Sequence, residues 1–181
     1  MKRKEFISST CKLGLCSCIP FSFFSSHEMF AKTDKDSNND WKIGFMQKRI
    51  AKFIENIDSA DKEKKIQIIE SIGKACAGEN ISFFNKYKGA PDEALNEIKK
   101  KWADKTEYNK EEKFIRITGK KKDSCGCPFV DDSIMPKEFC YCASGYFKEA
   151  FETILDNPVE VKIEESVLFG DEKCTHLINI I

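Results

Sequence analysis

The chain has 181 residues, with 30 basic and 30 acidic side chains, and hydrophobic residues make up 41% of it. Residues 1–31 hold four of the basic and two of the acidic side chains, so the rest of the chain is slightly acidic. Nucleic-acid binding relies on basic side chains that neutralise phosphates, and this balance argues against it. The ~150 residues after position 31 suffice for one domain of ordinary size.

Residues 1–31 have the order of charge and hydropathy that is typical of an export signal. A basic start at residues 2–4 precedes a mostly apolar stretch, and residues 32–40 form a polar linker. The apolar stretch is shorter and more interrupted than the ~20 apolar residues that span a bilayer. The domain itself is expected to cover residues 41–181.

Two kinds of signal match this segment. Residues 3–7 resemble a twin-arginine signal in which Lys4 replaces the second arginine, and residues 15–18 resemble a lipoprotein cleavage box with Cys18 as the lipid-bearing residue. We therefore expect an extracytoplasmic protein, periplasmic or membrane-anchored, that meets the membrane only through the signal or its lipid. The alternative is an N-terminus without a sorting role, which would leave the protein in the cytoplasm.

The first half of the domain is expected to be helical. Apolar residues recur three and four positions apart, which is the spacing of one helix face. This pattern predicts helical segments at residues 41–57, 66–76, 83–87 and 91–102. Asp58 or Ser59 can cap the second segment, Gly78 can end it, and Pro91 suits the first turn of the last.

The second half changes period. A helix capped by Ser144 is expected over residues 144–155. Short β-branched or alternating stretches predict strands at residues 114–118, at 159–164 with a continuation through 167–169, and at 174–181. The expected fold class is α+β, with a helical N-terminal half packed on a small antiparallel sheet.

Clustered cysteines are the most informative feature of the chain. Of nine cysteines, six remain after the first 31 residues: Cys76, Cys125, Cys127, Cys140, Cys142 and Cys174. Four of them form two Cys-x-Cys pairs, and residues two apart on an extended segment point to the same face. Each pair therefore offers two sulfurs to one partner.

The cysteine pattern leaves three kinds of chemistry open. Four thiolates can hold zinc or an iron–sulfur cluster. An even number of cysteines in an exported domain also suits disulfides, which would join different pairs because a ring within one pair is strained. The third interpretation is a set of catalytic or redox thiols.

Cys174 and His176 are a second candidate site. They are two apart on an expected strand, so they share a face, and a cysteine with a histidine partner can form a reactive thiolate. The simpler interpretation is a buried cysteine and a partly exposed histidine. The full set of candidate metal ligands is Cys125, Cys127, Cys140, Cys142 and Cys174, with His176 as a further ligand or catalytic partner.

The C-terminal part resembles a known family. The segments at residues 158–161, 165–166 and 170–174 resemble the end of 4-vinyl reductase-like domains and of L-2-amino-thiazoline-4-carboxylic acid hydrolase-like proteins. The resemblance covers residues 125–181 and implies a small-molecule-binding α+β domain. It also implies a zinc-ligand role for Cys174 and for Cys140 or Cys142. Many members carry a cysteine shortly after the Glu-Ser step, where this chain has residues 167–169.

The sequence thus predicts an exported, cysteine-rich domain that binds a metal or a small molecule through its thiols. A hydrolase of a small cyclic amide or thiazoline-like substrate is the first alternative. A domain stabilised by disulfides, with a structural or interaction role, is the second.

Overall fold

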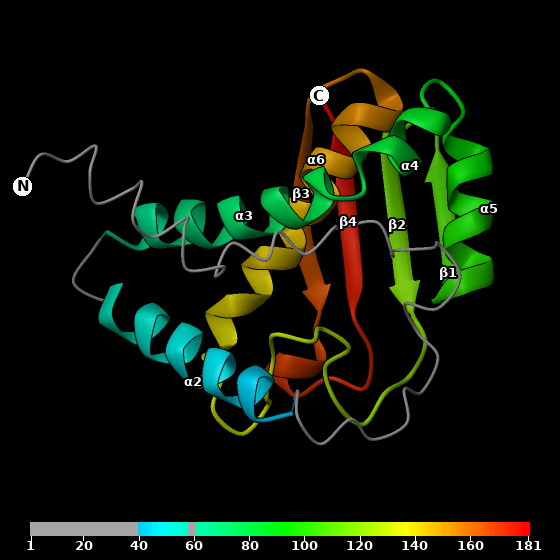
Figure 1. Ribbon diagram of the computed structural model, residues 1–181. Helices are drawn as coiled ribbons and strands as arrows, with labels where there is room; N and C mark the ends of the chain where they lie inside the picture. Colours follow the sequence, from blue (N-terminus) through cyan, green and yellow to red (C-terminus); the bar gives the residue numbers. More distant parts are fainter. Residues whose placement is uncertain (1–39, 58–60) are drawn as a thin grey trace, which may run out of the picture. The chain divides into compact units, whose positions relative to one another are not determined.

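The computed structural model describes residues 40–57 and 61–181, and these belong to one compact unit. The predicted export signal and most of the linker lie outside the described residues. Five α-helices and one four-stranded antiparallel sheet make up the described part, which confirms the α+β prediction (Figure 1). Within residues 40–57 and 61–181, no helix has the length and apolar character needed to cross a bilayer.

The helices of the first half form where the periodicity predicts them. They are α2 (Asp40–Asn56), α3 (Lys62–Gly78), α4 (Ile81–Lys86) and α5 (Pro91–Lys101). Pro91 stands in the first turn of α5, where its missing N–H is not needed. The cap of α3 differs from the expected one, because the Asp61 carboxylate accepts the backbone N–H of Glu63.

The second half contains one long helix and the sheet. Helix α6 (Tyr141–Leu155) packs on the sheet, whose strands are β1 (Ala103–Asn109), β2 (Phe114–Gly119), β3 (Val159–Glu165) and β4 (Thr175–Ile180), in the order β1-β2-β4-β3. Strand β1 was not predicted. It is an edge strand of mostly polar residues, and its pairing with β2 rather than its own pattern makes it a strand.

Two further predictions need correction. Residues 167–169 form a 3₁₀ turn, η3 (Val167–Phe169), rather than continuing a strand, because the Ser166 hydroxyl caps the turn by accepting the N–H of Leu168. Helix α6 begins three residues before the predicted cap, directly after the 3₁₀ turn η2 (Lys137–Cys140). Ser144 therefore lies inside the helix, where it is 2% exposed.

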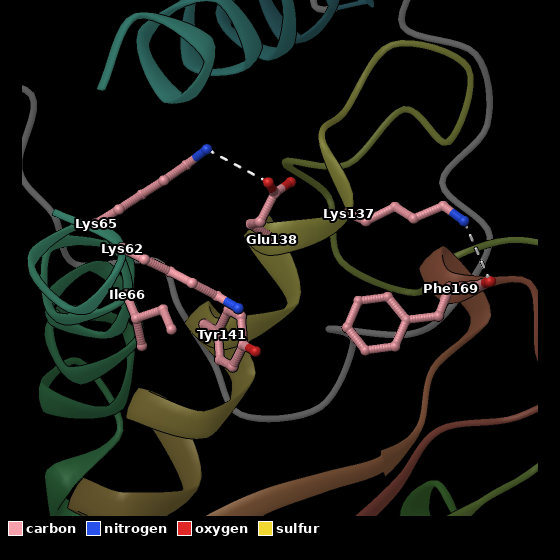
Figure 2. A pocket seen from close by; sticks show the side chains of 7 residues that line it. All are labelled: Lys62, Lys65, Ile66, Lys137, Glu138, Tyr141 and Phe169. Carbon is pink, nitrogen blue, oxygen red and sulfur yellow. Dashed lines mark hydrogen bonds and ion pairs between the residues drawn. The ribbon is translucent and has the colours of Figure 1, made fainter. Parts of the chain in front are cut away.

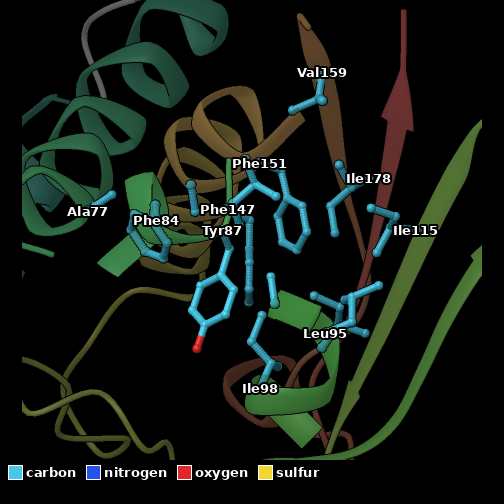
Figure 3. Close-up of a cluster of buried hydrophobic side chains, with 14 of the residues drawn as sticks. Ala77, Phe84, Tyr87, Leu95, Ile98, Ile115, Phe147, Phe151, Val159 and Ile178 are labelled. Carbon is cyan, nitrogen blue, oxygen red and sulfur yellow. The ribbon is translucent and has the colours of Figure 1, made fainter. Parts of the chain in front are cut away.

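The core lies between the sheet and helices α4, α5 and α6 (Figure 3). Ile115, Ile117 and Ile178 of β2 and β4 meet Phe147 and Phe151 of α6 there. Helix α3 packs on α6 as well, and this is the most extensive contact between any two elements of the described part. A second apolar cluster holds Ala51 and Ile54 of α2, Ile69 of α3, and Met135, Phe139, Cys142 and Leu168.

Candidate functional site

The six cysteines of the domain are all free thiols in the structure. Cys125 and Cys127 lie in the loop between β2 and η2, while Cys140 ends η2 and Cys142 lies in the first turn of α6. Cys174 stands immediately before β4, so it is not on the strand as expected. Cys127, Cys140 and Cys142 all pack in the second apolar cluster, so the fold brings the two Cys-x-Cys pairs to one place.

The loop that carries Cys125 and Cys127 is held on several sides. The Asp132 carboxylate accepts the N–H of Cys125 at 3.0 Å, and the carbonyl of Cys127 accepts the N–H of Val130 at 3.0 Å. From α2, the Gln47 amide donates to the carbonyl of Pro128 at 3.0 Å. These bonds give the loop a defined position without regular secondary structure.

Cys140 contacts the step formed by Glu165 and Ser166. Its sulfur lies 2.7 Å from the hydroxyl of Ser166, and either group can be the donor. The N–H of Ser166 donates to the Asp171 carboxylate at 2.8 Å, which ties the step to the Gly-Asp turn. Next to it, the Thr175 hydroxyl donates to the carboxylate of Glu165. Hydrogen bonds thus connect the segment from residue 165 to residue 175 next to Cys140.

Burial keeps the central thiols protonated at neutral pH. It raises the pKa of Cys140 to about 12, against a smaller lowering by the Ser166 hydrogen bond, and charge on Cys125 or Cys174 adds a little. Burial also raises the pKa of Cys142 to about 12, with smaller contributions from Cys127 and other thiols. Since the thiolate is the nucleophile and the metal ligand, these groups need a nearby cation before they react.

The arrangement of the thiols bears on whether they can hold a metal ion. A tetrahedral site needs four ligand atoms about 2.3 Å from one ion. Across the two described ranges, no group of three or more His, Cys, Asp or Glu side chains is arranged to hold a metal ion. The shared-face expectation is also wrong for Cys140 and Cys142, because they lie at a junction of 3₁₀ and α-helix rather than on an extended segment.

His176 lies deep in the core, contrary to the expectation of partial exposure. It is 5% exposed, whereas Cys174 is half-buried. Its neighbours across the sheet are Ile117 and Ile163, and the ring of Phe147 lies 4.5 Å from it between centroids. Burial lowers the pKa of His176 to about 4, so the imidazole is neutral at pH 7.

Two buried polar atoms of the described part have no hydrogen-bond partner, Nδ1 of His176 and Oγ of Ser144. Ser144 lies one helical turn before Phe147, so both project from the same side of α6. A buried polar group without a partner is energetically unfavourable.

A pocket of about 450 Å³ lies between α3, the junction of η2 with α6, and η3 (Figure 2). Its walls come from four elements: α3 with Lys62, Lys65 and Ile66, η2 with Lys137 and Glu138, α6 with Tyr141, and η3 with Phe169. Sequence reasoning missed this site, because no local pattern links segments so far apart in the chain. Tyr141 stands between Cys140 and Cys142, and it both lines the pocket and packs against the apolar cluster that holds the thiols.

Comparisons with known proteins support the fold only. The sequence matches no protein-family profile and no curated protein. A solved trafficking protein particle complex subunit 3 from Naegleria fowleri, covalently bound to palmitic acid, is 16% identical, with 81% of this chain and 97% of that chain covered and a TM-score of 0.51. The phenol-responsive sensory domain of the transcription activator PoxR, solved with phenol, is 12% identical over 74% of each chain, with a TM-score of 0.49. This chain therefore has an α+β fold related to that of the trafficking subunit.

Proposed function

We propose that this domain binds a small organic anion with an apolar part in the pocket between α3, η2 and η3. The single observation that carries the proposal is the composition of the pocket. Three lysines and one glutamate surround Ile66, Tyr141 and Phe169, in a volume that is usual for ligand sites. An ammonium-rich rim over aromatic and aliphatic side chains suits a carboxylate or sulfonate attached to an apolar group.

The charges of the pocket are only partly neutralised from within. Lys65 lies 3.4 Å from the carboxylate of Glu138, so this pair balances itself. Lys137 donates weakly to the carbonyl of Phe169 at 3.5 Å, and Lys62 has no ion-pair partner among residues 40–57 and 61–181. Two ammonium groups therefore remain for an anion.

A second cavity does not offer the same chemistry. It is larger, about 570 Å³, and lies between the start of α5 and the ends of α6 and β4. Its one lysine, Lys110, is already paired with Asp92 at 3.1 Å, and Glu93 adds a further negative charge. An anion is therefore disfavoured there.

Two likenesses support a small-molecule ligand. The C-terminal resemblance to 4-vinyl reductase-like domains implies small-molecule binding. The trafficking subunit of related fold was solved with covalently bound palmitic acid, an acid with an apolar chain. Both likenesses agree with the class of ligand that the pocket composition favours.

Binding is expected to depend on the two unpaired lysines. The probe is the fluorescent sulfonate 8-anilinonaphthalene-1-sulfonate, displaced by decanoate but not by decanol. The double change Lys62→Met and Lys137→Met should weaken binding of the probe about a hundredfold or more, since each of the two charged hydrogen bonds contributes ~1.5 kcal/mol or more. The control Lys64→Met removes an exposed lysine of α3 that does not line the pocket. Equal affinity in the double variant and the control would refute this site.

A thiophilic metal is the second candidate, because the fold gathers thiols from separate segments in one cluster. The loop with Cys125 and Cys127 would have to close on Cys140 for the thiols to serve as ligands. If they do, zinc should bind at a ratio of one per chain and protect thiols from a thiol-reactive dye. Cys140→Ser should abolish that protection, whereas Cys76→Ser, outside the predicted ligand set, should not.

The same measurement separates the remaining alternatives. If zinc protects none of the six thiols of residues 41–181, the metal site is refuted, and three disulfides among these six cysteines would favour the structural role. Hydrolysis of a thiazoline carboxylate, with His176 or Cys174 in the site, stays a prediction that a turnover assay checks.

A further inference from the structure

The domain buries only a narrow apolar strip of helix α2 and leaves several large apolar side chains of the helix exposed. Ala51 and Ile54 are 5% and 0% exposed and pack in the second apolar cluster. Five large apolar side chains on the rest of the helix are 46–61% exposed: Trp41, Ile43, Phe45, Met46 and Phe53. Such a concentration on one short helix is unusual for a surface in contact with water alone.

The exposed side chains are organised along the helix. Trp41 and Phe45 are four residues apart, and their rings meet edge to face at a centroid distance of 6.4 Å. One turn further on, the guanidinium of Arg49 lies 4.5 Å from the centre of the Phe45 ring. Aromatic rings next to a cation on one helix are typical of helices that lie in a membrane–water interface.

The charge of α2 is opposite to that of the domain. The helix has four basic residues, Lys42, Lys48, Arg49 and Lys52, and two acidic residues, Asp40 and Glu55. The 150 residues after position 31 carry 26 basic and 28 acidic side chains. A basic helix on an acidic domain is attracted to an anionic lipid surface with this side turned towards it.

The chain places α2 close to its predicted membrane-associated segment. Only the eight residues 32–39 separate the predicted signal or lipid site from Asp40. Eight residues span at most ~28 Å even when fully extended. A chain held at the membrane through its first 31 residues would therefore keep α2 within reach of the same surface.

We propose that α2 lies flat on an anionic lipid surface, with Trp41, Phe45 and Phe53 buried among the lipids and Lys48 and Arg49 at the headgroups. A second copy of this chain fits the helix less well. Two α2 helices packed face to face about a two-fold axis would bring two surfaces of like charge together. The proposal does not depend on the ligand pocket.

The test follows the fluorescence of Trp41 in the full chain. The chain has two tryptophans, and the difference between the parent and Trp41→Phe isolates Trp41 from Trp102. Vesicles that contain phosphatidylglycerol should shift the emission of Trp41 to shorter wavelength and protect it from acrylamide. Pure phosphatidylcholine vesicles, or high salt, should weaken both effects.

The variants separate apolar insertion from charge. Phe45→Ser with Phe53→Ser should weaken binding to the anionic vesicles about tenfold or more, because two apolar side chains no longer leave water. Lys48→Gln with Arg49→Gln should weaken it roughly thirtyfold, at ~1 kcal/mol per charge. The control Ile68→Ser with Ile81→Ser removes apolar side chains of similar exposure, 38% and 36%, from α3 and α4 and should have little effect.

Three results would overturn the proposal. The first is a chain that binds vesicles through other residues while the emission of Trp41 stays unchanged. The second is an emission that is already shifted and protected in the free chain, which would mean that the chain covers its own α2. The third is a shift of the Trp41 emission that grows with protein concentration in the absence of vesicles, together with dimers detected by light scattering. That result would mean that a second copy of the chain covers α2.

Discussion

Gly145→Ala is expected to lower the free energy of unfolding by about 3 kcal/mol or more, since overpacking a rigid contact commonly costs 1–3 kcal/mol and occasionally more. A Cβ atom at Gly145 of α6 would meet the backbone carbonyl of Glu70 in α3 far inside contact distance. The contact is reciprocal, because a Cβ at Gly73 of α3 would meet the carbonyl of Cys142 in α6. Backbone atoms of two packed helices cannot move aside as a side chain can, so the helices would have to separate.

Urea denaturation of Gly145→Ala, with Gly44→Ala as the matched control, measures this effect. Gly44 lies inside α2, and a Cβ atom there would have nothing within 4 Å. The control should therefore gain roughly 0.5–1 kcal/mol from the better helix propensity of alanine. A Gly145→Ala protein as stable as the control would show that α3 and α6 are not in direct backbone contact.

Acid is expected to destabilise the domain through His176. Burial lowers the pKa of this imidazole to about 4 in the folded protein, against about 6.5 in the unfolded chain. Between these values the unfolded chain binds the proton and the folded protein does not, so stability falls as the pH decreases. The slope approaches ~1.4 kcal/mol per pH unit, and the total loss from pH 7 to pH 4 is about 3 kcal/mol.

The contribution of His176 is measured as the difference between the parent and His176→Phe in how the free energy of unfolding depends on pH. Phenylalanine keeps a planar ring but has no titrating group. The variant should lose most of the decline between pH 6.5 and pH 4, whatever its stability at pH 7. His27→Gln changes the other histidine of the chain and should leave the decline unchanged. An identical pH dependence in the parent and His176→Phe would mean that the imidazole is accessible to protons in the folded state.

The elements with a strong local signal were predictable from the sequence. The three- and four-residue spacing of residues 41–57 marked α2, and Pro91 marked the start of α5. The β-branched run at residues 114–118 marked β2. Periodicity failed for β1, because a polar edge strand takes its conformation from hydrogen bonds to its neighbour.

The candidate site was predictable only as a set of residue types. The sequence pointed to Cys125, Cys127, Cys140 and Cys142 as a group, and three of these pack in one apolar cluster. It did not indicate the pocket, whose lysines come from α3 and η2, some seventy residues apart. A cluster of charge at a pocket has no sequence period, so no local signal could have revealed it.

By itself, the sequence determined the α+β composition, the approximate positions of the helices and the supply of six thiols in the domain. Only the tertiary structure decided that α3 and α6 meet through Gly73 and Gly145 and that His176 is buried. It also decided which apolar side of α2 the domain leaves exposed. The physical reason is that spacing along the chain encodes which residues share a face of a helix or strand. Whether that face meets a backbone, a thiol or water depends on segments far away in the sequence.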